Sequence, residues 1–124
     1  MTREAFAAWL DRYGRAWEAR DPDAAADLFT ADARYHWTPF GEPKRGRAEI
    51  AQAWGEATSR QRDVRFACEI LCVDNGRGVA HWRTTLTRAH TGAAVTIDGV
   101  LTAELGADGL CTVFREWWHS TEED

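Results

Sequence analysis

The sequence predicts an α+β domain in which helices from the first half of the chain pack on one side of a curved antiparallel sheet. Two observations support this fold class. Residues 3–19 carry large apolar side chains at three- and four-residue spacing, which is typical of an amphipathic helix. Residues 64–119 contain four segments in which apolar and polar side chains alternate, separated by glycine-containing turns. We expect one domain spanning residues 1–124.

The first half supplies three helices and one short strand. After the helix over 3–19, Asp21 and Pro22 begin a second helix, because aspartate caps a helix and proline fits its first position. Residues 33–38 resemble a short strand, and Pro39 to Gly46 form a loop. A third helix follows, at about 47–60. The apolar stripes of the first and third helices consist of Phe6, Trp9, Leu10, Tyr13 and Trp17, and of Ile50, Ala53, Trp54 and Ala57.

The second half supplies a meander of four strands, predicted at 64–73, 79–88, 95–105 and 111–119. Turn residues lie between them, including an Asp-Asn-Gly sequence after the first. The acidic residues 120–124 are expected to fray. The chain order is therefore helix, helix, strand, helix and four strands.

Charge, cysteine content and the lack of long apolar runs exclude several classes of function. The 124 residues carry a net charge of −5, which gives no electrostatic reason to bind nucleic acid or an anionic membrane. Three cysteines without a Cys-x-x-Cys motif make a zinc site unexpected. No signal peptide or long apolar run is visible, so we expect a cytoplasmic protein.

The last strand contains the residue that most suggests chemistry. Alternation places Glu116 on the same face as Phe114 and Trp118. A carboxyl group between large aromatic side chains is costly to ionise, which raises its pKa and makes it a useful acid or base near neutral pH. The alternative is a glutamate at the rim of the sheet, paired with an arginine and without a catalytic role.

Several phrases resemble the SnoaL-like branch of the nuclear-transport-factor-2-like superfamily, which includes polyketide cyclases. They are DPDAAADLFTADA at 21–33, PFG at 39–41, GRAEI at 46–50 and FREWW at 114–118. The resemblance implies a cone, in which a strongly bent antiparallel sheet packs against the three helices around an apolar pocket. It also implies a homodimer through the outer sheet face and acid/base chemistry without a cofactor.

The strand at 79–88 allows two orientations. Hydrophobicity favours the face of Ala80, Trp82, Thr84 and Leu86 as the inner one. The resemblance favours the opposite face, because it places Arg83 where limonene epoxide hydrolase has its pocket arginine. We adopt the second orientation, which puts Trp82 and Leu86 outside with Val113 and Trp117 as a dimer surface.

Two specific activities of relatives are not expected. Glu116, Arg83 and Tyr35 match positions of the limonene epoxide hydrolase site, but Trp37 and Thr85 replace its asparagine and second aspartate, so the set that opens an epoxide is broken. Tyr13 matches the oxyanion-hole tyrosine of ketosteroid isomerase. The position of that enzyme's general base is taken here by Trp37 or Thr38, and Leu101 replaces its second oxyanion-hole residue, with Asp98 on the outer face.

The predicted catalytic residues are therefore Glu116 as the acid or base, Arg83 to hold it ionised or to stabilise an enolate, and Tyr35. The predicted ligand is a small apolar molecule with one polar group. A non-catalytic ligand-binding or dimerisation domain, with Arg83 and Glu116 as a structural ion pair, is the alternative. The predicted pocket lining consists of Tyr13, Trp37, Trp54, Phe66, His81, Thr85, Ile97, Leu101, Phe114 and Trp118.

Overall fold

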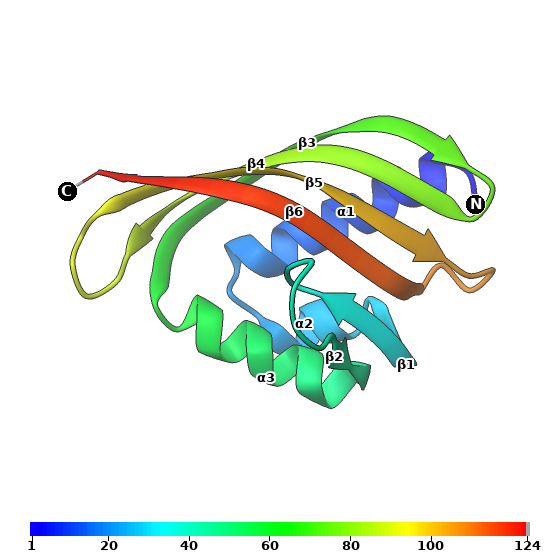
Figure 1. Cartoon of the computed structure of the whole chain (residues 1–124), viewed down its shortest axis with the longest axis horizontal. Coiled ribbons are helices and arrows are strands. Elements are labelled where there is room, and N and C mark those ends of the chain that lie inside the picture. The colour runs from blue at the N-terminus through cyan, green and yellow to red at the C-terminus, as the bar shows by residue number, and fades with distance from the viewer. Residues whose placement is uncertain (124) are drawn as a thin grey trace.

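Three helices and six strands form the fold of residues 1–123, the part of the chain that the structure, a computed structural model, describes (Figure 1). Their order confirms the predicted α+β class, with one additional short strand. The helices are α1 (Arg3–Glu18), α2 (Pro22–Ala26) and α3 (Gly46–Thr58). The strands are β1 (Phe29–His36), β2 (Lys44–Arg45), β3 (Gln61–Asp74), β4 (Arg77–Arg88), β5 (Ala94–Leu105) and β6 (Cys111–Glu123).

Side-chain caps fix where the first two helices begin. The Thr2 hydroxyl accepts a hydrogen bond from the Ala5 amide at 3.0 Å, and the Asp21 carboxylate accepts one from the Ala24 amide at 3.1 Å. Each bond satisfies an amide that the first helical turn leaves unpaired. The predicted stripe of α1 is buried against the sheet, with Phe6 and Tyr13 at most 1% exposed.

The six strands form one sheet in the order β2-β1-β6-β5-β4-β3. The predicted antiparallel meander of β3 to β6 is confirmed, and β1 joins β6 in parallel. Strand β1 begins at Phe29, earlier than predicted, because Phe29 and Ala33 pack into the core. The predicted loop before α3 contains β2, in which Lys44 and Arg45 pair with Tyr35 and Arg34.

The long strands curve as one layer over the helices, so that the concave face of the sheet and the helices enclose the core (Figure 1). Aromatic rings fill much of this interior. Phe114 on β6 lies 5.4 Å from Tyr13 and 4.6 Å from Tyr35, measured between ring centroids. Contacts of this kind bury large apolar areas and stabilise the domain.

Strand β4 takes the orientation that hydrophobicity favours. Trp82, Thr84 and Leu86 are buried on the inner face, at 2%, 0% and 3% exposure. The prediction that Arg83 faces inward and that Trp82 and Leu86 form an outer surface is therefore wrong. A solvated guanidinium on the convex face costs far less than a buried one, whereas the indole gains by burial.

The last strand is longer than predicted. Residues 120–123 do not fray but extend β6, with Thr121 opposite Thr96 and Glu122 opposite Val95. Their backbone hydrogen bonds to β5 hold them in place, together with an ion pair between Arg88 and Glu122 at 3.1 Å. Asp124, predicted to belong to the frayed tail, lies outside the described residues.

Candidate functional site

Glu116 lies on the inner face of β6, between Phe114 and Trp118 along the strand, and its exposure is 6%. Among residues 1–123, no basic side chain forms an ion pair with it. Burial raises the pKa of Glu116 from 4.5 to about 8, and the Tyr35 hydroxyl partly offsets this by favouring the ionised form. The protonated carboxylic acid is therefore the favoured form at neutral pH.

Two adjoining cavities meet at Glu116. The inner one has a volume of about 30 Å³, which is room for a water molecule or one polar atom of a ligand. The outer one has a volume of about 360 Å³, which is enough for a small organic molecule. Residues that line both cavities are Trp17, Trp37, Ala57, Gln61 and Glu116.

Each cavity also has residues of its own. The inner cavity is further lined by Tyr13, Tyr35, Trp54 and Thr58. The outer cavity is further lined by Arg60, Trp82, Arg88, Val95, Ile97, Trp118 and Ser120.

Two tyrosine hydroxyls lie together at the inner cavity. The Tyr13 and Tyr35 oxygens are 3.0 Å apart, so one phenol donates a hydrogen bond to the other. Burial raises the pKa of both phenols well above 10, and the nearby Glu116 carboxyl adds to the shift. Both phenols therefore remain protonated and act as hydrogen-bond donors at neutral pH.

The buried Nε1 atom of the Trp82 indole has no hydrogen-bond acceptor in the described part of the chain. The Trp54 indole instead faces the Tyr35 hydroxyl, whose pKa it lowers as a hydrogen-bond donor. The Trp17 indole donates to the Gln61 side-chain oxygen at 2.9 Å, and the Trp118 indole donates to the Trp37 carbonyl at 3.1 Å. Buried N–H groups are normally paired, and the Trp82 Nε1 atom is an exception. It is enclosed by protein atoms and is not itself exposed to the cavity.

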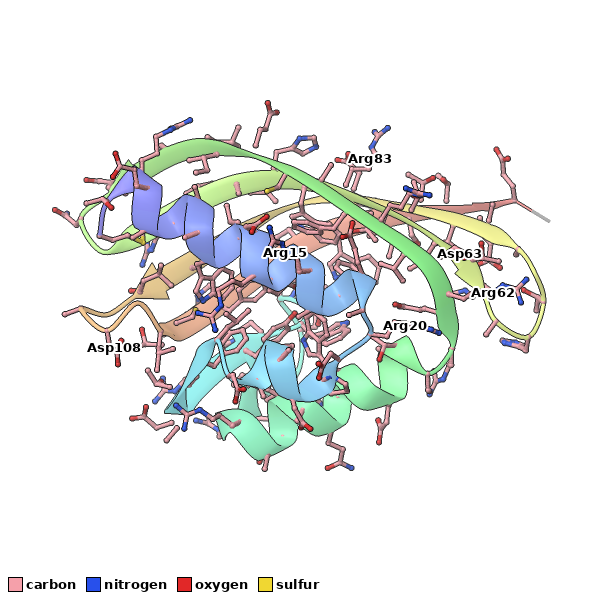
Figure 2. All side chains as sticks on the ribbon, turned by 180° about the vertical axis from the view of Figure 1, so that it is seen from behind. Arg15, Arg20, Arg62, Asp63, Arg83 and Asp108 are labelled. Carbon is pink, nitrogen blue, oxygen red and sulfur yellow. The ribbon has the colours of Figure 1, made fainter. Side chains whose placement is uncertain are left out.

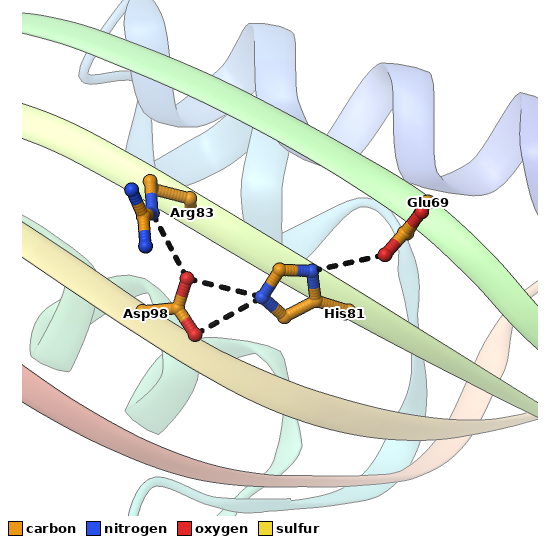
Figure 3. A network of polar contacts seen from close by, with 4 residues as sticks. All are labelled: Glu69, His81, Arg83 and Asp98. Carbon is orange, nitrogen blue, oxygen red and sulfur yellow. Dashed lines mark hydrogen bonds and ion pairs between the residues drawn. The ribbon is translucent and has the colours of Figure 1, made fainter.

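Arg83, His81 and Thr85 do not reach this site, because all three lie on the outer face of β4. Figure 2 shows Arg83 projecting from the side of the sheet away from the helices. Its guanidinium donates to Asp98 at 2.9 Å, and His81 lies 3.0 Å from Asp98 and 3.3 Å from Glu69 (Figure 3). The prediction that these three residues belong to the pocket is therefore wrong. The predicted ion pair between Arg83 and Glu116 is also wrong, because Arg83 pairs with Asp98.

This outer cluster has its own electrostatics. Asp98 chiefly, with Glu69, raises the pKa of His81, and Arg83 and His81 lower the pKa of Asp98. All four side chains are at least partly exposed, so water screens these interactions.

The other predicted pocket residues divide into two groups. Tyr13, Trp37, Trp54, Ile97 and Trp118 line one or both cavities, as do Tyr35 and Glu116. Phe66, Leu101 and Phe114 line neither cavity; Leu101 and Phe114 are fully buried in the core, and Phe66 packs against it.

Sequence reasoning missed several lining residues. Trp17 was assigned only to the stripe of α1, although the same stripe carries Tyr13 into the cavity wall. Gln61 is the first residue of β3 and is buried, and its carbonyl accepts a hydrogen bond from Arg20 at 2.9 Å; Figure 2 labels Arg20 near this start of the strand. A polar residue between a helix and a strand gave no signal of burial.

Two further features bear on function. In residues 1–123, no group of three or more His, Cys, Asp or Glu side chains is arranged to hold a metal ion. None of the helices described is long and apolar enough to cross a membrane.

Residues 5–114 match the SnoaL-like domain family. No curated protein matches the chain by sequence. Among solved structures, the Δ5-3-ketosteroid isomerase from Mycobacterium sp. is similar with a TM-score of 0.79 and 21% identity, over 95% of this chain and 98% of that one.

Two other solved structures are similar. One is the epoxide hydrolase/cyclase-like enzyme SalBIII, which has a role in pyran ring formation in the polyether salinomycin (TM-score 0.81, 18% identity, 96% of this chain and 95% of that one). The other is a computationally designed 17-OHP binder (TM-score 0.82, 18% identity, 95% and 96%). At such identities the likeness shows the fold alone, and it confirms the predicted nuclear-transport-factor-2-like cone.

Proposed function

Because the chain belongs to the SnoaL-like domain family, we propose that it is an acid/base enzyme acting on a small, mostly apolar molecule with an oxygen-bearing group. The observation that carries the proposal is Glu116, a buried carboxyl without an ion pair at the junction of two cavities. The reaction is of the cyclase, isomerase or dehydratase type.

The proposed chemistry is proton transfer by one carboxyl group. Glu116, protonated at neutral pH, donates its proton to a ligand oxygen at the inner cavity, and the resulting carboxylate then removes a proton from carbon or from a hydroxyl. The Tyr35 hydroxyl stabilises the carboxylate, as the direction of its effect on the pKa indicates. The Tyr13 hydroxyl, 3.0 Å from that of Tyr35, holds it in position.

The outward position of Arg83 supports this assignment. An arginine paired with Glu116 would keep the carboxylate ionised and make it a weak base. Here Arg83 is engaged by Asp98 on the opposite face of the sheet. Glu116 is therefore available to exchange a proton with a ligand.

A non-catalytic ligand-binding domain is the second candidate. The small inner cavity favours it, because about 30 Å³ admits one polar group and the surrounding aromatic rings hold the rest of the ligand outside. The designed 17-OHP binder is an example of this fold in a binding role. Turnover distinguishes the two candidates.

The experiment compares the wild type with Glu116→Gln and with a control, Glu69→Gln, on the outer face. Displacement of a hydrophobic fluorophore measures ligand binding, and a panel of hydroxyketones and enones is screened for turnover. We expect Glu116→Gln to retain the fluorophore and to lower turnover about 100-fold or more, while Glu69→Gln has little effect. Wild-type activity should decline as pH rises through about 8, because the acid form is lost.

Other outcomes decide against the enzyme. Ligand binding without any turnover would support the binding domain. Failure of the folded protein to bind any fluorophore would refute both candidates and favour a dimerisation domain with an interior filled by aromatic side chains.

We also propose that two copies pair through the outer sheet face. Trp117 on β6 is 45% exposed there, and its neighbours include the half-buried Val100. Exposed aromatic side chains on an open sheet face often mark an interface. Light scattering should give the mass of a dimer for the wild type and of a monomer for Trp117→Lys; a wild-type monomer contradicts the proposal.

A further inference from the structure

The rim of the outer cavity carries two arginines. Arg60 lies between α3 and β3, and Arg88 ends β4, so two segments distant in sequence each contribute an arginine to one cavity. Both line the same 360 Å³ cavity as Glu116. Positive charge gathers here although the whole chain has a net charge of −5.

The two arginines differ in their partners. The Arg88 guanidinium pairs with the Glu122 carboxylate at 3.1 Å, which largely neutralises it. Within residues 1–123, no carboxylate lies within ion-pair distance of Arg60. Glu56 lines a shallow depression beside Arg60 but contacts Gln52 instead. The rim therefore offers one guanidinium without an ion-pair partner among the described residues.

The cavity walls offer donors rather than acceptors. The Trp82 indole lines the outer cavity, with its Nε1 atom enclosed by protein and without an acceptor in the described part of the chain, and the Trp54 indole of the inner cavity faces the Tyr35 hydroxyl as a donor. The Gln61 side-chain oxygen is already occupied by the Trp17 indole. Glu116 adds another donor in its protonated form. A ligand that pairs with Glu116 and with Arg60 at the rim therefore supplies acceptor oxygens and negative charge.

We propose that the ligand of this site is an amphipathic monocarboxylic acid. Its carboxylate binds Arg60 at the rim, its apolar body packs against the tryptophans of the outer cavity, and a second oxygen reaches Glu116. One uncompensated guanidinium matches one negative charge, and its planar fork suits a carboxylate. This inference deepens the proposed function, since it names the substrate class for the same cavity.

Isothermal titration calorimetry with 2-naphthylacetate and the matched neutral 2-naphthylacetamide tests the inference. The wild type should bind the acid about fivefold more tightly than the amide, which is the size of an exposed ion pair. Arg60→Gln should abolish that preference without weakening the amide. Arg12→Gln, on an exposed position of α1 that lines neither cavity, should preserve the preference. Raising the sodium chloride concentration should weaken the binding of the acid and leave the binding of the amide unchanged.

The outcomes separate this inference from the proposed function. The monocarboxylate assignment is overturned if acid and amide bind equally well, or if the preference for the acid survives Arg60→Gln. The role of Glu116 is then still decided by the turnover experiment. Failure of both compounds to bind, with the fluorophore still bound, also overturns the assignment. If the wild type turns over neutral substrates only, and Glu116→Gln abolishes that turnover, the enzyme is upheld and the acid ligand is rejected.

Discussion

Glu116→Gln should change the pH dependence of stability, because glutamine keeps the shape of the side chain and removes its titration. Below pH 4.5 the carboxyl is protonated in both the folded and the unfolded state. Between 4.5 and about 8 the unfolded chain releases the proton and the folded protein retains it. The contribution of Glu116 to the free energy of unfolding is therefore highest at low pH and falls as pH rises above 4.5. It stops falling once the pH exceeds the pKa of Glu116 in the folded protein.

The magnitude follows from the two pKa values, 4.5 and about 8. Each unit between them is worth about 1.4 kcal/mol, so the free energy of unfolding should fall by about 4 kcal/mol between pH 5 and pH 9 through Glu116 alone. Domains of this size have total stabilities of roughly 5–15 kcal/mol, so the change is large enough to measure. The other carboxyl groups titrate in both proteins and cancel in the comparison.

Urea unfolding followed by tryptophan fluorescence is the assay, since the chain has seven tryptophans. The difference in unfolding free energy between wild type and Glu116→Gln is plotted from pH 5 to pH 9. We expect the unfolding free energy of the wild type to fall steadily relative to that of the variant as pH rises. The difference between the two should become constant above pH 8. Parallel curves, or a difference that changes by less than about 1 kcal/mol, would show that Glu116 ionises normally and refute the reasoning.

Three further predictions concern the surroundings of the site. Tyr35→Phe removes the group that favours ionised Glu116, so the pH at which the stability difference levels off should move upward in the same urea assay, with an overall loss of about 1–2 kcal/mol. Gly99→Ala should destabilise by about 2 kcal/mol or more in thermal unfolding, because a Cβ there would clash with the backbone carbonyl oxygen of Trp117; an unchanged melting temperature contradicts this. Asp98→Asn should lower the pKa of His81 in an NMR titration and leave ligand binding in the cavity unchanged, since both residues lie on the outer face.

The error at Arg83 shows which sequence signal to trust. The alternation of β4 alone places Trp82 and Leu86 inside, because burying them gains more than burying a guanidinium. The positional resemblance to limonene epoxide hydrolase reversed that orientation. A shift of one residue exchanges the two faces of a strand, so an uncertain match of positions cannot override the hydrophobic pattern.

The longer β6 has a different origin. Residues 120–123 are polar and acidic, and only Thr121 among them favours a strand. They are ordered by pairing with the first residues of β5 and by the Arg88–Glu122 ion pair, which are contacts with distant segments. Local patterns carry no information about such partners.

By itself the sequence determined the fold class, the order of the elements other than β2, and the aromatic neighbours of Glu116 along its strand. These follow from side-chain periodicity and turn residues, which act over a few positions. The tertiary structure alone decided the volumes of the two cavities, the absence of an ion pair at Glu116 among the described residues, and the placement of Arg60 and Arg88 in the wall of one cavity. Those properties depend on distances between segments far apart in the chain, which only the closed packing of helices on the curved sheet fixes.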